Sequence, residues 1–214
     1  MSTPGDVRTP HDAALHVDFR SPTLPDALQW FCEPPRWRID SGAGRLVVAS
    51  AAGTDFWQRT HYGFRPDNGH ALLMTVPAAR DFTLSTRVQF RARHQYDQAG
   101  LMLRVSADDW LKTSIEYEPH GACRLGAVVT QRGWSDWSTQ DVSNEVRAVS
   151  LRIVVRAHDC LVEASLDGSS WSQIRLAHLG ALDGAATLEC GLYLCSPKED
   201  GFEAAFEHLD YAPS

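Results

Sequence analysis

The chain has 214 residues, of which 43% are hydrophobic and 22% are charged, and its formal net charge is −7. This length can bury a substantial core and fits one large all-β domain better than two small ones. The acidic balance, with no long basic run, argues against nucleic acid or an anionic membrane surface as the main partner.

Short apolar or alternating runs recur along the chain, and turn signals separate them. The runs predict strands over residues 15–19, 45–49, 70–76, 82–90, 100–105, 111–118, 123–130, 151–157, 161–166, 173–176, 187–194 and 202–209. Between them, Pro66-Asp67-Asn68-Gly69 and Asp167-Gly168 suit turns, because Gly and Asn accept positive φ. We expect the second of these turns, with Trp171 beside it, to be purely structural. No long segment shows a capped helical period, so the pattern indicates an all-β sandwich or barrel.

Two segments interrupt this series of strands. Residues 21–38 carry four prolines and cannot form a central strand, because proline lacks the N–H donor that a ladder needs. We therefore expect this segment to be a connection that crosses the surface. Residues 136–147 are polar and less periodic, which predicts a long loop with Trp134 and Trp137 near its start. In the absence of a linker or an internal repeat, we assign one domain to residues 12–214 and a flexible N-terminus to residues 1–11.

Cysteine usage indicates the cellular compartment. The chain has five cysteines, an odd set without the paired spacing of a zinc site: Cys32, Cys123, Cys160, Cys190 and Cys195. Most lie in predicted strands, where cysteine behaves as a small buried apolar residue, so we expect reduced thiols, with a disulfide between neighbouring strands as the alternative. The polar start of the chain and the lack of a long apolar stretch add to this, and they favour a cytoplasmic protein that does not contact a membrane.

No metal or cofactor is expected. The nine histidines are scattered, and His61, Asp67 and His70 form only a weak metal pattern. The sequence contains no Gly-rich phosphate loop, no nucleophile elbow and no Cys–His signature.

The segment from Gln98 to Glu116 is the best candidate for function, because two period-two runs flank a polar turn and place charges on one sheet face. If residues 106–110 form the loop, Arg104 lies directly opposite Lys112. Like charges opposite each other destabilise a ladder, so the pair needs either nearby carboxylates such as Glu116 or an anionic or polyhydroxy ligand. We therefore predict a ligand site on this face.

Several short motifs extend this site into a family pattern. They are Asp55-Phe56-Trp57, Tyr62-Gly63-Phe64, Gly69-His70, Asp97-Gln98-Ala99-Gly100, Trp110-x-Lys112, Ser135-Asp136-Trp137-Ser138 and Gly191-x-Tyr193-x-x-Ser196-Pro197. In order and spacing they resemble the uncharacterised domain family whose fungal members are named for regulation of enolase, within the concanavalin A-like lectin and glucanase superfamily. The resemblance covers roughly residues 19–211. It implies an all-β jelly-roll sandwich of two antiparallel sheets, one with a concave outer face on which superfamily relatives bind sugars, and it supplies no catalytic residues.

A sugar site needs flat aromatic faces together with amide, carboxylate and guanidinium groups that pair with hydroxyls. The predicted ligand-binding residues of these kinds are Trp57, Tyr62, His70, Asp97, Gln98, Arg104, Trp110, Lys112, Glu116 and Trp137. Strand alternation predicts Phe56 and Phe64 in the core. Two alternatives stay open at this point: Asp97 caps a local turn instead of touching a ligand, and Trp137 covers the sandwich core.

The sequence favours a non-catalytic binding module for a carbohydrate or sugar-phosphate-like ligand, since adjacent cations suit an anionic group. A first alternative is a glycoside hydrolase or lyase that uses Glu116 with a second carboxylate such as Glu118, although the Glu-x-Asp-x-x-Glu pattern of related glucanases is absent. A second is a scaffold for a protein partner in the regulation of carbohydrate metabolism. The plain structural explanation is a solvated charged face. For a true surface site, Lys112→Ala or Glu116→Ala would abolish binding with little change in melting temperature.

Overall fold

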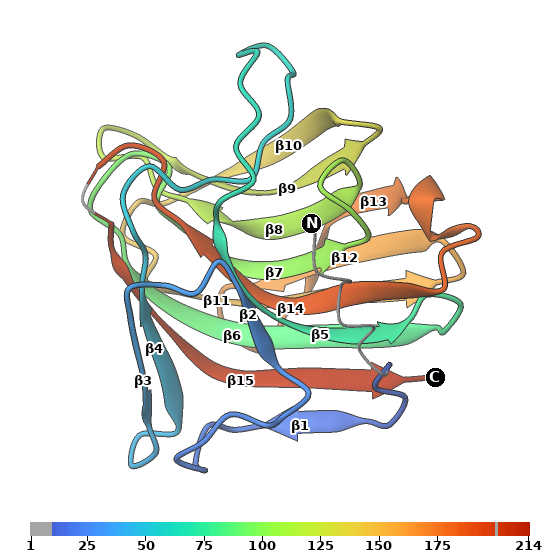
Figure 1. Ribbon diagram of the computed structural model, residues 1–214. Helices are drawn as coiled ribbons and strands as arrows, with labels where there is room; N and C mark the ends of the chain where they lie inside the picture. Colours follow the sequence, from blue (N-terminus) through green and yellow to red (C-terminus); the bar gives the residue numbers. More distant parts are fainter. Residues whose placement is uncertain (1–9, 200) are drawn as a thin grey trace, which may run out of the picture.

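The computed structural model describes residues 10–199 and 201–214, and two antiparallel sheets pack face to face in it (Figure 1). The eight-stranded sheet follows the order β13 (Ser172–His178), β12 (Asp159–Ser165), β11 (Ala148–Arg156), β6 (Phe82–Arg91), β15 (Glu203–Pro213), β4 (Arg45–Ala49) and β3 (Arg36–Asp40), and β1 (Leu15–Val17) also pairs with β15. The seven-stranded sheet follows the order β10 (Trp134–Val142), β9 (Cys123–Gln131), β8 (Trp110–Glu116), β7 (Gln98–Arg104), β14 (Thr187–Cys195), β5 (His70–Pro77) and β2 (Gln29–Phe31). A short 3-10 helix, η1 (Gly180–Leu182), precedes β14.

This arrangement confirms the predicted all-β jelly-roll sandwich of two antiparallel sheets. Each predicted strand overlaps an observed one. The proline-rich segment contributes only β2 and β3, which lie at the edges of the two sheets, where a missing ladder donor costs least. The Asp167 side chain accepts hydrogen bonds from the backbone of Ser169 and Ser170, which stabilises the Asp167-Gly168 turn.

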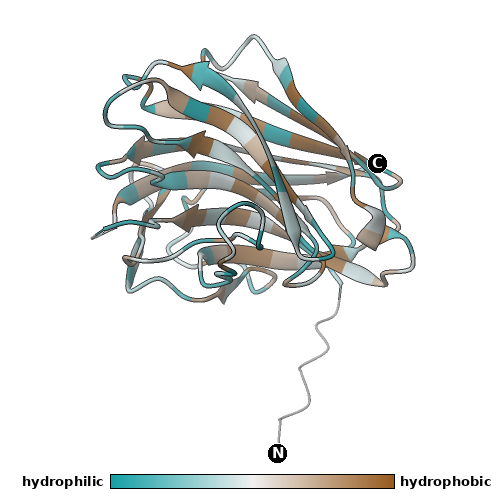
Figure 2. Cartoon of the chain, turned by 90° about the horizontal axis from the view of Figure 1, so that it is seen from above, coloured by the Kyte–Doolittle hydropathy of each residue, from teal (hydrophilic) through white to brown (hydrophobic). Residues whose placement is uncertain are grey.

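The main core lies between the sheets. Apolar side chains alternate with polar ones along strands such as β6, where Phe82, Leu84 and Val88 are fully buried. Figure 2 shows hydrophobic and hydrophilic bands following one another along the strands. The period of two in β6 and β11 thus directs one face of each strand inward. Each such side chain contributes roughly 1.5–3 kcal/mol when removed from water, so this layer supplies most of the stabilisation.

A second apolar cluster covers the outer face of the seven-stranded sheet. It contains Phe56, Trp57, Ala71, Leu73, Met102, Trp110, Val128, Tyr193 and Cys195. The cluster exists because residues 50–69, which connect β4 to β5, fold over this face and bury Phe56 completely. We call residues 50–69 the crossover. Consequently β7 and β8 are buried on both faces, including at their charged positions.

Two local predictions outside the β7–β8 hairpin are wrong. The long loop expected over residues 136–147 is largely strand β10, which pairs with β9 along its whole length. As an edge strand it is half exposed, so its polar sequence shows no apolar alternation. Phe64, expected in the core, is 49% exposed and stacks on Tyr62 with ring centroids 5.3 Å apart.

Most of the N-terminus expected to be flexible, residues 1–9, lies outside the described residues. The backbone of His11 donates a hydrogen bond to Thr75. All five cysteines are free thiols. Over residues 10–199 and 201–214, no helix has both the length and the apolar character needed to cross a membrane.

Candidate functional site

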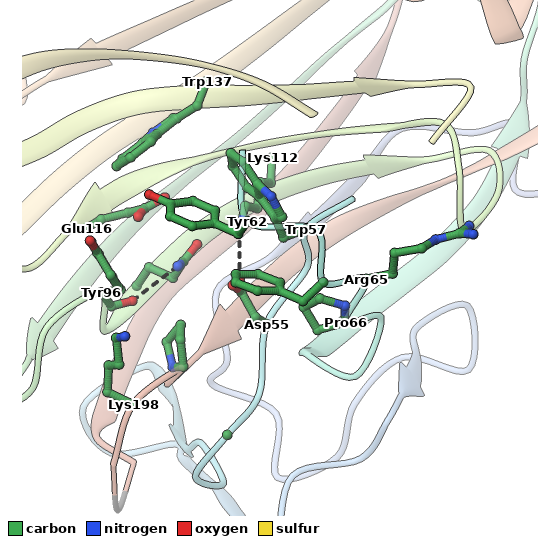
Figure 3. Close-up of a pocket in the computed structure, with 14 residues that line it drawn as sticks. Asp55, Trp57, Tyr62, Arg65, Pro66, Tyr96, Lys112, Glu116, Trp137 and Lys198 are labelled. Atoms are coloured by element: carbon green, nitrogen blue, oxygen red, sulfur yellow. Dashed lines mark hydrogen bonds and ion pairs between the residues drawn. The ribbon is translucent and has the colours of Figure 1, made fainter. Parts of the chain in front are cut away.

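A pocket of about 450 Å³ opens on the outer face of the seven-stranded sheet, within the range of roughly 300–1,000 Å³ usual for small-molecule sites. Side chains from β7, β8, β10, the crossover and the β14–β15 connection converge on it (Figure 3). The lining residues are Gly53, Asp55, Trp57, Tyr62, Phe64, Arg65, Pro66, Tyr96, Gln98, Lys112, Glu116, Trp137, Pro197 and Lys198. We call it the main pocket.

Strand β8 places a buried lysine on the floor of the main pocket. Lys112 is 2% exposed, and its Nζ lies 3.1 Å from Oδ1 of Asp55 in the crossover. Burial alone would lower the pKa of Lys112, but the attraction of Asp55 and Glu116 outweighs it, and the pKa is raised. Lys112 therefore carries its positive charge beneath the pocket and tethers the crossover to the sheet.

Glu116 lies four residues after Lys112 in β8, on the same face of the strand. Of the acidic side chains that line the pocket, it has the pKa that is shifted most. Burial raises its pKa from an ordinary 4.5 to about 7, against the opposing effect of Lys112, and the negative charges of Asp55 and Glu118 add to the rise. Near neutral pH, Glu116 is present in both protonated and ionised forms, so it can donate or accept a hydrogen bond to a ligand.

Three aromatic side chains form the walls above this floor. The ring of Trp57 meets Tyr62 at 5.7 Å and Trp137 at 6.4 Å between centroids, both edge to face. The indole Nε1 of Trp57 donates to the carbonyl of Thr60, 3.0 Å away, which fixes the ring. Tyr62 is 50% exposed, so its ring surface is available at the mouth of the pocket.

Gln98 supplies an oriented amide at the far side of the floor. Its Nε2 donates to the carbonyl of Tyr96, and its Oε1 accepts from the hydroxyl of Tyr193, both over 3.1 Å. Tyr96 and Lys198 close this end, with the Lys198 ammonium 5.7 Å from the centre of the Tyr96 ring. The two hydrogen bonds of Gln98 hold the amide in one orientation.

The predicted register of the β7–β8 hairpin is wrong. The connection consists of residues 105–109, so Arg104 lies opposite Trp110, and Lys112 lies opposite Met102. Trp110 belongs to the strand because its ring is part of the apolar cluster under the crossover. The two cations share a face but are not directly opposed, and each has a carboxylate of its own.

Arg104 is paired away from the main pocket. Its guanidinium donates two hydrogen bonds to Asp67, 2.8 and 2.9 Å long, and lies 4.5 Å from the centre of the Phe31 ring. A bidentate pair stacked on an aromatic ring is a strong structural contact. Arg104 thus holds the end of the crossover rather than a ligand.

Six of the ten predicted ligand-binding residues line the main pocket: Trp57, Tyr62, Gln98, Lys112, Glu116 and Trp137. Four do not line it: His70, Asp97, Arg104 and Trp110. The His70 ring accepts a hydrogen bond from the backbone of Ala51 and contacts the carbonyl of Cys32.

Asp97 and Trp110 also form hydrogen bonds within the protein. Asp97 accepts hydrogen bonds from the backbone of Arg93 and His94, as in the turn-capping alternative, and from the Ser196 hydroxyl. Trp110 is fully buried, and its Nε1 donates to the carbonyl of Ala107. These residues support the fold around the site.

Sequence reasoning missed the two carboxylates that neutralise the cations. Asp55 is 57 positions from Lys112, and Asp67 is 37 positions from Arg104. A lysine or arginine in a strand that is buried on both faces does require a partner, but only the folded crossover shows which one. Within the part of the chain that the structure describes, no group of three or more His, Cys, Asp or Glu side chains gathers in a way that could hold a metal ion.

Comparison with known proteins places this architecture. The family described as "Protein of unknown function (DUF1349)" matches residues 30–214. "Regulation of enolase protein 1" of Saccharomyces cerevisiae is 35% identical over 164 residues, which are 77% of this chain and 79% of that protein. "The crystal structure of a functionally unknown protein from Saccharomyces cerevisiae" has a TM-score of 0.79 and 30% identity, over 88% of this chain and 97% of that one.

Less similar solved structures share the fold. The GH43 protein BlXynB of Bacillus licheniformis has a TM-score of 0.74 at 17% identity, over 93% of this chain and 39% of that one. Such a likeness shows the architecture alone. The resemblance of the motif series to the regulation-of-enolase-like family is confirmed, and the match over most of its length shows that this chain belongs to the DUF1349 family.

Proposed function

We propose that the protein is a non-catalytic binding module that holds a carbohydrate in the main pocket. The observation that carries the proposal is the combination of the aromatic walls of Trp57, Tyr62 and Trp137 with a floor of oriented polar groups. Pyranose rings offer an apolar face to aromatic side chains and a ring of hydroxyls to amides and carboxylates. Gln98 and Glu116 supply those partners on the floor.

The charge arrangement favours a neutral sugar over a sugar phosphate. A phosphate would need a cation that is free to pair with it. Lys112 is already bound to Asp55, Arg104 to Asp67, and Arg65 at the rim to Asp108. Lys198, the remaining cation that lines the pocket, is exposed and contacts the Tyr96 ring, so an anionic ligand would have only this one side chain to pair with. The floor also contains Glu116, which repels an anion whenever it is ionised. A hydroxyl-rich ligand without charge avoids both costs.

The free thiols support a cytoplasmic location as part of the same proposal. Four of the five cysteines are buried, and none is paired. Secreted proteins of this size commonly pair their cysteines in an oxidising compartment.

The test is a binding panel read by thermal shift and calorimetry. It contains glucose- and xylose-based oligosaccharides, glucose 6-phosphate and fructose 6-phosphate; xylose is included because solved chains of the same fold include a xylan beta-1,4-xylosidase from Bacillus halodurans. A ligand that binds only the folded state raises the melting temperature. We expect neutral sugars to raise the melting temperature, and we expect the Glu116→Gln substitution to weaken their binding. If no sugar stabilises the protein, the proposal fails, and a protein-scaffold role gains weight.

A second candidate function, glycoside cleavage, rests on one observation. Asp55 and Glu116 both line the main pocket, and a carboxyl with a pKa of about 7 can donate a proton near neutral pH. Glu118, the partner considered from the sequence, instead accepts hydrogen bonds from Gln95 and does not line the pocket. Release of reducing ends from cellotetraose or xylotetraose, lost in Glu116→Gln, would establish cleavage, whereas binding without product would support the binding module.

A further inference from the structure

A second hollow adjoins the main pocket. It has a volume of about 440 Å³ and lies between the crossover and the edge strand β10. Thr60, His61, Ser135 and Asp136 belong to it alone. We call it the side pocket.

The two pockets meet at the same three rings. Trp57, Tyr62 and Trp137 line both of them. Together the hollows extend from the β14–β15 connection, past β7 and β8, to β10 at the edge of the sheet. Their junction is therefore aromatic, and polar groups lie at either end, which is the distribution that a chain of sugar rings requires.

The chemistry of the side pocket suits hydroxyl groups better than charge. His61 lies edge to face against Tyr62, with centroids 4.8 Å apart, and its ring, which carries two nitrogens that can hydrogen-bond, lines the hollow. Asp136 is paired with Arg175 over 2.9 Å, yet its side chain is 70% exposed and retains lone pairs for a ligand. Within the described residues, no lysine or arginine lines this hollow.

We infer that the ligand is a linear oligosaccharide of at least two rings, with one ring in the main pocket, the next in the side pocket, and the linkage beside Tyr62. This rests on the proposed function. A single sugar would leave one of the two hollows empty. A longer chain fills both and buries the half-exposed ring of Tyr62.

The experiment is a length series of xylose, xylobiose and xylotetraose, and of glucose, cellobiose and cellotetraose, measured by calorimetry on the full chain. In the series that binds, affinity should rise at least about tenfold from the monosaccharide to the tetrasaccharide. The variant His61→Asn removes the ring and suits the backbone, because His61 has φ 63° and asparagine tolerates that region. It should weaken the tetrasaccharide about fivefold or more and leave the monosaccharide within about twofold.

The matched control is Glu116→Gln, which alters the main pocket only and should weaken every length. If affinity does not depend on length, or if His61→Asn weakens the monosaccharide and the tetrasaccharide equally, the extended ligand is excluded, while the proposed function stands. If neither series binds at any length, both are overturned. Unchanged melting of the unliganded His61→Asn variant shows that the comparison is made on folded protein.

Discussion

The ammonium of Lys112 and the carboxylate of Asp55 lie 3.1 Å apart on the floor of the main pocket, although 57 positions separate them in the chain. The contact joins the centre of the seven-stranded sheet to the crossover that covers it. Because Lys112 is almost entirely buried, the pair is part of the fold as well as part of the pocket. Substitutions at Lys112 and Glu116 are therefore expected to change the stability of the fold as well as binding.

Loss of Lys112 should destabilise the fold. Lys112→Met leaves the Asp55 carboxylate partly buried without its partner, and removal of one member of a buried pair costs about 3 kcal/mol or more. Urea denaturation measures the free energy of unfolding. The double variant Lys112→Met/Asp55→Asn should regain much of the loss. A single variant as stable as the wild type would show that the contact is not structural.

Glu116 should make stability depend on pH. Its pKa is 4.5 ordinarily and about 7 in the fold, so the folded state binds more protons than the unfolded state between these values. The contribution of Glu116 to the free energy of unfolding therefore falls as pH rises from about 4.5 to about 7. Glu116→Gln should be more stable than the wild type at pH 8, by about 2 to 3 kcal/mol, with the difference narrowing towards pH 5.

The control for this titration is Glu118→Gln, since Glu118 lies outside the main pocket and pairs with Gln95. Its stability curve should keep the pH dependence of the wild type. Denaturation midpoints at several pH values decide the matter, and a Glu116→Gln curve parallel to that of the wild type would contradict the expectation.

Arg104 should separate stability from binding. Arg104→Lys keeps the charge but loses the bidentate pairing with Asp67 and the stacking on Phe31, so we expect about 1–3 kcal/mol of destabilisation. Because Arg104 does not line the main pocket, carbohydrate affinity measured well below the melting temperature should stay within about twofold. A large affinity loss in a folded variant would return Arg104 to the site.

Two tryptophans of β10 form a matched pair. Trp137 lines both pockets, whereas Trp134 is 58% exposed and lines neither. Trp137→Ala should therefore abolish carbohydrate binding in calorimetry, and Trp134→Ala should leave it intact. Equal effects from the two substitutions would mean that the ligand contacts β10 at its end rather than in the pockets.

The thiols should differ in reactivity. Burial raises the pKa of Cys160 to about 12 and raises those of Cys190 and Cys195 far above the ordinary value. Partial burial and the charge of Asp67 also raise the pKa of Cys32, but Cys32 alone is exposed to a reagent. A thiolate is the reactive form. A thiol reagent at pH 8 should modify one cysteine in the native protein and all five after denaturation. Rapid native modification of several thiols would show that the sandwich opens readily.

Periodicity predicted much of the fold because most strands have one face in the core. In β6 and β11 the inward positions repeat every second residue, and the sequence shows them directly. Strand β10 was not predicted, because an edge strand with a solvated face shows no alternation of apolar and polar residues. The error in the β7–β8 connection has the same origin: Trp110 stands beside a polar turn, and only the cluster under the crossover requires its ring.

The candidate site was predicted in part because its floor lies on strands and its cover does not. Alternation placed Lys112 and Glu116 on one face, and both line the main pocket. The crossover has no period, so the partners that it provides, Asp55 and Asp67, could not be assigned by spacing. Residues such as His70 have the right chemistry for a ligand but use it to hold the chain.

The crossover also offers a place to redesign this protein. Its two anchors, Asp55 on Lys112 and Asp67 on Arg104, stand close together, since Phe56 and Asp67 form an antiparallel bridge. The chain between the two anchors therefore forms a loop whose ends lie side by side, and the exposed rings of Tyr62 and Phe64 lie at the tip of this loop. A loop of another length or composition grafted in place of residues 61–64 would leave these anchors and the buried rings of Phe56 and Trp57 where they are. Ligand preference can thus be altered at the tip while the sandwich beneath it stays unchanged.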